Sequence, residues 1–156
     1  MRARDDKPAG DKRPRRSAYD KALALLARRE QSRRELRTKL ARDGYASDEI
    51  DDAMQRLGEA HYQDDARFAE MLVRSRIRQG YGPQRLRAEL RTHDLPDDLI
   101  AAQLAEADAD WLAQAREQLQ RRYGDSAPQD YRERARRMQF LVRRGFDPAT
   151  AHAATE

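Results

Sequence analysis

The chain has 156 residues, and 32 basic side chains against 28 acidic ones give it a net charge of +4 at pH 7. It has no cysteine, which excludes disulfides, catalytic thiolates and cysteine-based zinc sites. No apolar run approaches the length of a membrane-spanning helix, and the first residues lack the apolar core of a signal peptide. We therefore expect a cytoplasmic protein that makes no membrane contact.

Residues 1–16 form a polar, basic segment that contains Pro8, Gly10 and Pro14 and shows no apolar periodicity. We interpret this segment as a disordered tail that either contacts an acidic surface or nucleic acid, or only aids solubility. It holds seven basic and three acidic side chains, so the other 140 residues carry 25 of each sign. This balance argues against phosphate contacts as the main source of affinity for a partner.

The most informative feature is a repeat, because residues 32–57 align without a gap on residues 82–107. Leu40 of the first copy falls on Leu90 of the second, and a fainter third copy begins 101 positions after the first. A supersecondary unit repeated at this period indicates a helical repeat protein. We predict an all-α fold of three tandem three-helix repeats in an elongated, curved array. The predicted units are residues 17–60, 61–108 and 109–156.

Capping residues and apolar periodicity predict three helices in each unit. The predicted starts lie near Ser17, Ser32 and Ser47, then near Asp64, Pro83 and Pro96, then near Trp111, Tyr131 and Pro148. In the third unit we expect the middle helix to pack one apolar side inward. That side consists of Tyr131, Ala135, Met138, Leu141 and Val142.

Each copy also carries the same signal for the end of a helix. A residue that tolerates positive φ is followed by an apolar residue, which packs back on the last helical turn. The predicted stop residues are Leu40, Gly44 and Tyr45, then Leu90, Asp94 and Leu95, then Leu141, Gly145 and Phe146. The alternative is three unrelated helix ends, since glycine is common after helices.

The sequence contains no motif for catalysis. His61 with Asp64 and Asp65 could hold a metal ion, but helix capping explains both acids. The Gly80-x-Gly82 pair follows a predicted helix, so we interpret it as a hinge between helices rather than a dinucleotide loop. We therefore expect no enzyme activity, no cofactor and no metal.

Arginines recur at helical spacing away from the predicted apolar faces, and such stripes either bind a partner or form an ordinary solvated surface. Stacked repeats can align them along one surface. The candidate binding residues are Arg67, Arg74, Arg78, Arg87 and Arg91 of the second unit and Arg132, Arg136 and Arg143 of the third.

Three segments resemble the RecX family of regulatory proteins, namely residues 22–40, 61–90 and 140–146. The second is the most specific, with an acidic pair before Arg-Phe-Ala and a Gly-x-Gly before an amphipathic helix. The resemblance implies a non-enzymatic protein that binds the RecA–DNA filament, and we expect this protein to be a monomer. It also implies inhibition of the ATP hydrolysis, strand exchange and co-protease activity of RecA.

Two other hypotheses remain open. One is a direct DNA- or RNA-binding helical protein, which predicts a steep fall of affinity with salt. The other is a general interaction scaffold in the manner of TPR or HEAT arrays, although the signature residues of those repeats are missing.

Overall fold

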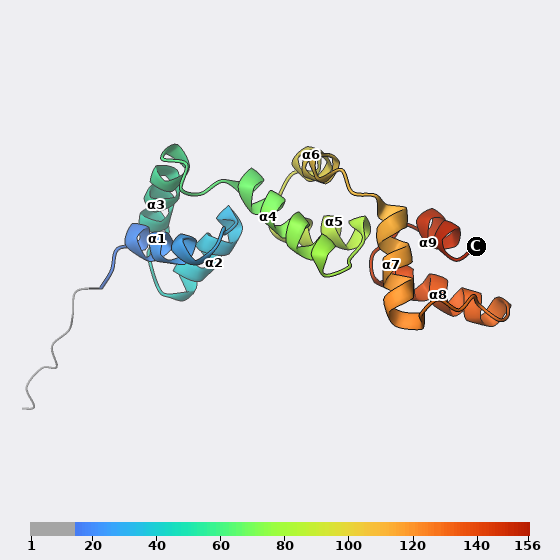
Figure 1. Ribbon diagram of the computed structural model, residues 1–156. Helices are drawn as coiled ribbons and strands as arrows, with labels where there is room; N and C mark the ends of the chain where they lie inside the picture. The colour runs from blue at the N-terminus through green and yellow to red at the C-terminus, as the bar shows by residue number, and fades with distance from the viewer. Residues whose placement is uncertain (1–14) are drawn as a thin grey trace, which may run out of the picture.

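A computed structural model describes residues 15–156, and this part of the chain forms nine α-helices and no strand (Figure 1). The helices are α1 (Ala18–Arg28), α2 (Arg33–Arg42), α3 (Ser47–Glu59), α4 (Asp65–Arg78), α5 (Pro83–Thr92), α6 (Asp97–Ala107), α7 (Trp111–Tyr123), α8 (Tyr131–Arg143) and α9 (Pro148–Ala154). The predicted tail lies outside the described residues up to position 14. Arg15 places its guanidinium over the ring of Tyr45, whose hydroxyl donates to the carbonyl of Arg16 at 2.7 Å.

The helices form three units in a row, and the molecule is elongated and arched (Figure 1). Unit 1 contains α1–α3, unit 2 contains α4–α6 and unit 3 contains α7–α9. In each unit the first and third helices pack against each other. The predicted fold class, an all-α array of three-helix repeats, is therefore confirmed.

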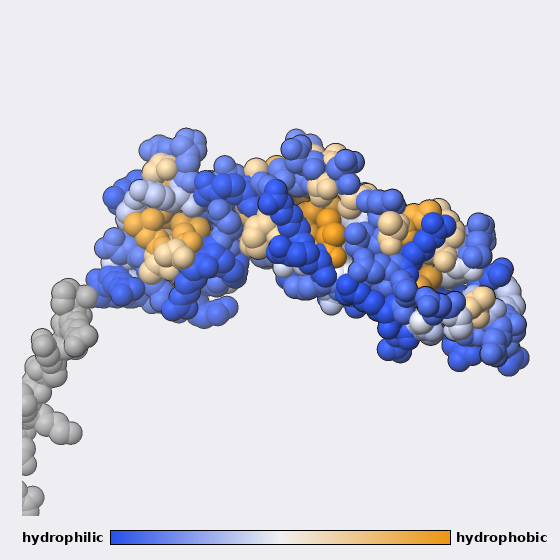
Figure 2. Space-filling view, in the orientation of Figure 1, coloured by the Kyte–Doolittle hydropathy of each residue, from blue (hydrophilic) through white to orange (hydrophobic). Residues whose placement is uncertain are grey.

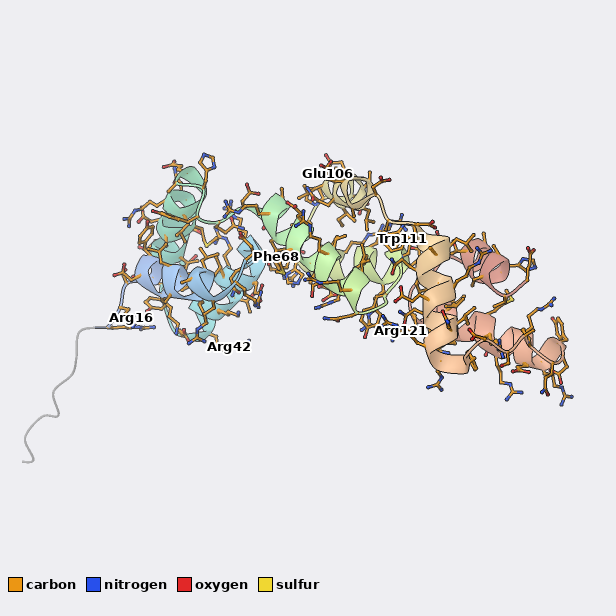
Figure 3. All side chains as sticks on the ribbon, viewed as in Figure 1. Arg16, Arg42, Phe68, Glu106, Trp111 and Arg121 are labelled. Atoms are coloured by element: carbon orange, nitrogen blue, oxygen red, sulfur yellow. The ribbon has the colours of Figure 1, made fainter. Side chains whose placement is uncertain are left out.

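Each unit buries its own small hydrophobic core, and Figure 2 shows the apolar surface in separate patches. Leu40 is fully buried in the core of unit 1 and Leu90 in that of unit 2, while Leu141 and Phe146 are buried in the core of unit 3. Burying a side chain of this size contributes roughly 1.5–3 kcal/mol. Trp111, at the start of α7, packs against the cores of both unit 2 and unit 3 (Figure 3).

The ends of the middle helices have a common backbone geometry. Positive φ angles occur at Gly44, Asp94 and Gly145, with values of 84°, 58° and 100°. At the end of α2 the amide of Tyr45 donates to the carbonyl of Leu40 at 3.2 Å. At the end of α8 the amide of Phe146 donates to the carbonyl of Leu141 at 3.1 Å. These bonds satisfy carbonyls that the helix itself leaves without a donor.

The prediction of which α8 residues face the core is wrong for two of them. Leu141 is buried, but Tyr131 and Val142 are 85% and 45% exposed. The small core of unit 3 contacts the side of α8 that carries Phe140 and Leu141 instead. Since α8 has apolar residues on two sides, periodicity alone cannot identify the side that a neighbouring helix covers.

An arginine occupies part of that covered side. Arg137 is only 5% exposed, and its guanidinium donates to the carbonyl of Ser126 at 2.7 Å and to the carboxylate of Glu133 at 2.8 Å. It also lies over the ring of Tyr123, 4.6 Å from the centroid. A buried charge is tolerated when such partners compensate it.

Units 2 and 3 meet backbone to backbone. The amide of Gly82, the N-cap of α5, donates to the carbonyl of Arg144 at 2.9 Å, and the amide of Gln84 donates to that of Gly145 at 2.8 Å. The positive end of the α5 dipole thus meets the negative end of α8. A Cβ atom on Gly82 would lie 2.5 Å from the carbonyl carbon of Gly145, so this contact requires glycine.

Units 1 and 2 meet in the same end-to-end manner through side chains. Ser32, the N-cap of α2, has its hydroxyl 2.7 Å from Nδ1 of His93, the C-cap of α5. The His93 ring packs on Phe68, with centroids 4.6 Å apart. Arg34 forms an ion pair with Asp94 at 2.7 Å. The middle helices of all three units are therefore linked in series.

We expect Gly145→Ala to lower the free energy of unfolding by about 2–4 kcal/mol. Alanine is strained at the positive φ of this position, and its Cβ atom would clash with Arg85. A Cβ atom on Gly145 would lie 2.5 Å from the Cβ atom of Arg85. Gly124 has φ of 73° but no neighbour within 4 Å, so Gly124→Ala should cost only about 1–2 kcal/mol. Gly58→Ala, within α3, should be neutral or stabilising. Urea denaturation measures all three. Equal losses for the variants at 145 and 124 would contradict the close junction.

Burial lowers the pKa of His93, and Arg29 acts in the same direction, while Glu35, Glu89 and Asp65 oppose the shift. The folded chain therefore binds fewer protons than the unfolded chain. The stability that results from this difference in proton binding is fully present above the unfolded pKa of about 6.5. It is lost as the pH falls below that value. We expect the free energy of unfolding to fall between about pH 7.5 and 5.5, and to fall less in His93→Gln. If the free energy of unfolding falls equally with pH in the wild type and in His93→Gln, His93 does not cause the loss of stability.

Candidate interaction surface

The three candidate arginines of α4 lie together. Arg67, Arg74 and Arg78 line one surface hollow of ≈ 340 Å³. Two acids share that hollow: Glu70 pairs with Arg74 at 2.7 Å, and Glu30 reaches it from unit 1. Among the described residues Arg78 has no carboxylate within ion-pair distance. The hollow is therefore of mixed charge rather than uniformly basic.

Arg67 has a structural role that its spacing did not reveal. Its guanidinium pairs with Glu30 of unit 1 at 2.9 Å and donates to the carbonyls of His61 and Tyr62 at 2.7 and 3.0 Å. The ion pair ties the start of α4 to the loop after α1, and the two carbonyl contacts anchor Arg67 to the segment before α4. Arg67 is thus less free than Arg78 to bind a partner.

The α5 candidates differ from each other. Arg91 is exposed and pairs with Asp97 of α6 at 3.1 Å. Arg87 lies one turn earlier on α5, is half-buried, and forms no ion pair with any described residue. Arg87 therefore has the freer charge of the two.

The strongest concentration of positive charge lies where unit 2 meets unit 3. Two candidates from α8, Arg136 and Arg143, meet other arginines and aromatic residues there, and together they line a cleft of ≈ 460 Å³, which we call the basic cleft. Its lining residues are Tyr81, Arg85, Arg122, Tyr123, Arg136, Phe140, Arg143 and Arg144. Arg132 lies one turn before Arg136 on the exposed side of α8.

Aromatic rings hold the arginines of the basic cleft in place. The guanidinium groups of Arg85 and Arg144 lie 4.0 and 4.4 Å from the centroid of the Tyr81 ring. Arg144 also donates from Nε to the carbonyl of Gly80 at 3.1 Å. Arg122 lies 5.7 Å from the centroid of Phe140. Cation–π contacts orient a guanidinium without neutralising it, so its donors remain available to an anion.

The chemistry of the basic cleft suits anionic groups. None of its lining residues is acidic. Guanidinium groups form paired hydrogen bonds with carboxylates and phosphates, and aromatic rings beside them can stack on bases. The cleft can therefore contact an acidic protein surface, a nucleic-acid backbone or both.

Sequence reasoning missed three of the five cleft arginines, Arg85, Arg122 and Arg144. They belong to different helices or helix ends and share no helical stripe with the candidates. The sequence did contain one signal for these arginines. Tyr81 and the glycines beside it mark the place where unit 3 docks, so arginines near that place were candidates for a binding surface.

The residues considered for a metal ion have other roles. Asp64 caps α4 by accepting from the amides of Ala66 and Arg67, and Asp65 accepts from the amide of Arg33 at 2.9 Å. Within residues 15–156 no group of three or more His, Asp or Glu side chains is arranged to hold a metal ion. No helix in the same residues is long and apolar enough to cross a membrane.

The fold and its surfaces define a class: a row of three-helix units with arginine-lined hollows on its surface. Comparisons with known proteins identify a family within this class. Family models for the first, second and third three-helix domains of RecX match residues 18–57, 64–104 and 108–155.

Relatives cover nearly the whole chain. A Regulatory protein RecX from Stenotrophomonas maltophilia (strain R551-3) is 46% identical over 153 residues, which span 97% of this chain and 94% of that protein. One from Halorhodospira halophila (strain DSM 244 / SL1) is 47% identical over 135 residues, or 86% and 84% of the two chains. The chain belongs to the RecX family of regulatory proteins.

A solved structure agrees in fold. The crystal structure of RecX from Lactobacillus salivarius superposes with a TM-score of 0.73 and covers 88% of this chain and 91% of that chain. The two sequences are 22% identical, so the likeness concerns the fold alone.

We expect Arg67→Gln to lower the free energy of unfolding by about 1–2 kcal/mol, because it removes the ion pair with Glu30 of unit 1 and two hydrogen bonds to the segment before α4. Arg78→Gln is the matched control on the same helix and should change stability by less than about 0.5 kcal/mol. Thermal and urea denaturation measure both variants. If the two variants lose the same stability, Arg67 does not hold the junction.

Proposed function

We propose that this protein binds the filament that RecA forms on DNA and inhibits its ATP hydrolysis, strand exchange and co-protease activity. Membership in the RecX family supports the proposal, since the family resemblance implies this partner. The observation that carries it is the basic cleft, where five arginines gather without an acidic side chain.

The chemistry of such a filament fits the surface. A protein–DNA filament presents acidic side chains and phosphates together, and arginine binds both through paired hydrogen bonds. Phosphate contacts position a protein without reading sequence, which suits a regulator of a filament that forms on any DNA. An arched row of units is a reasonable shape for a helical groove.

We assign the contact surface to the basic cleft and the arginines beside it. The cleft residues are Arg85, Arg122, Arg136, Arg143 and Arg144, and the further candidates are Arg67, Arg74, Arg78, Arg87, Arg91 and Arg132. In this proposal the units at residues 17–60, 61–108 and 109–156 act together as a cytoplasmic monomer.

Direct binding of DNA or RNA is the second candidate function. The aromatic rings of the basic cleft favour it, because bases stack on such rings. The balanced charge of residues 17–156 opposes it as the only activity, since a protein that depends on phosphates is usually basic throughout.

The test compares the wild-type protein with Arg122→Glu/Arg136→Glu on preformed RecA filaments at two salt concentrations. Both arginines are exposed and line the basic cleft, so reversing them should leave the fold intact. We expect filament binding to weaken by at least about tenfold and inhibition of ATP hydrolysis to be relieved accordingly. Arg87→Glu/Arg91→Glu tests the α5 candidates in the same assay.

The matched control is Arg28→Glu/Arg42→Glu, which reverses two exposed arginines of unit 1 and changes the net charge equally. It should inhibit nearly as well as the wild type. If the cleft variant inhibits as strongly as the wild type, the basic cleft is not the contact surface. If the wild type ignores the filament but binds naked DNA with a steep salt dependence, direct nucleic-acid binding is the function.

A further inference from the structure

The outer side of α8 carries an apolar stripe whose end residues are exposed and whose two middle residues are half-buried. We call Tyr131, Ala135, Met138 and Val142 the α8 stripe, and they recur at spacings of four, three and four. This spacing places all four side chains along one line of the helix. Tyr131 and Val142 are two of the three large hydrophobic side chains that are exposed in residues 15–156, the third being Tyr62.

The α8 stripe is separate from the core of unit 3. That core contacts the opposite part of α8 through Phe140 and Leu141. The stripe instead lines a shallow hollow of ≈ 380 Å³ together with Gln139 and Arg143. A hollow lined chiefly by apolar side chains and rimmed by polar ones is typical of a surface that binds another protein.

Positive charge borders the α8 stripe on both edges. At 100° per residue, Arg132 and Arg143 fall on one side of the stripe, and Arg134 falls on the other. None of these three has a carboxylate within ion-pair distance among the described residues, whereas Arg121 and Arg137 nearby are both paired. The edges of the stripe therefore offer free cations.

We propose that the α8 stripe docks an amphipathic helix of a protein partner whose apolar side is bordered by Asp or Glu residues. The apolar residues of that helix would fill the hollow at successive turns, and its carboxylates would pair with Arg132, Arg134 and Arg143. This docking site borders the basic cleft and shares Arg143 with it, but its apolar stripe lies outside the cleft.

Charge and composition disfavour the other occupants. In a dimer formed through α8, the arginine edges of one copy would face those of the other, which like-charge repulsion opposes. Residues 1–14 have only Met1, Ala3 and Ala9 as non-polar residues besides proline and glycine, so they cannot supply a matching apolar side. Nucleic acid would pair with the arginines and leave the apolar side chains without a role.

The experiment uses a designed probe, a fluorescent helical peptide of about 14 residues with leucines at spacings of three and four and glutamates on both flanks. Full-length protein is titrated against it and anisotropy is recorded. We expect Tyr131→Gln/Met138→Gln to weaken binding by at least about tenfold. A matched peptide with lysine in place of glutamate should also bind at least about tenfold more weakly.

Tyr62→Gln is the matched control, because Tyr62 is 53% exposed and lies outside α8. It should change peptide affinity by less than about twofold. The proposal is overturned if the stripe variant binds the acidic peptide as well as the wild type does, or if the lysine peptide binds equally. It is also overturned if sedimentation shows a wild-type dimer that the stripe variant abolishes, since a second copy would then be the occupant.

Discussion

The structure depends on the way in which the middle helices of the three units meet end to end. The amides of Gly82 and Gln84 at the start of α5 donate to the carbonyls of Arg144 and Gly145 directly after α8, and the N-cap of α2 contacts the C-cap of α5. Each contact joins the positive end of one helix dipole to the negative end of another, and the α5–α8 contact uses backbone groups that a single helix leaves unpaired. One junction uses the backbone and requires Gly82 and Gly145, while the other uses the side chains of Ser32 and His93. The arch therefore rests on a few residues at the unit boundaries, and the basic cleft exists because unit 3 docks where it does.

Much of the fold could be predicted because its signals are local. The ungapped repeat revealed the unit, and the capping box at Ser32, whose hydroxyl accepts from the amide of Glu35 at 3.0 Å, marked a helix start. Gly82 before Pro83 marked another start. Positive φ at Gly44 and Gly145 likewise follows from the absence of a Cβ atom. Features of this kind depend on residues within one or two helical turns, which periodicity and capping rules describe well.

The binding surfaces were harder to predict because they depend on contacts between distant residues. Arg67 has the spacing of a surface arginine, yet it pairs with Glu30, 37 positions away. Arg144 reaches Gly80 across the junction of two units and helps to form a cleft that no single stripe contains. Arg137 is buried although it is charged, and Tyr131 and Val142 of the α8 stripe are exposed where the pattern indicated core. Periodicity identifies the sides of a helix, but only the docking of neighbouring helices decides which of those sides is covered.

If the end-to-end junctions are the basis of the arch, units 1 and 3 must hold one relative position in solution. The chain has no native cysteine, so cysteines placed at Ala41 of α2 and Ala149 of α9, both exposed, can be spin-labelled selectively. Double electron–electron resonance then measures the distance between the two labels in the free protein. The junctions predict a single narrow distance distribution. A broad or multimodal distribution would mean that the units move independently and would contradict a fixed arch.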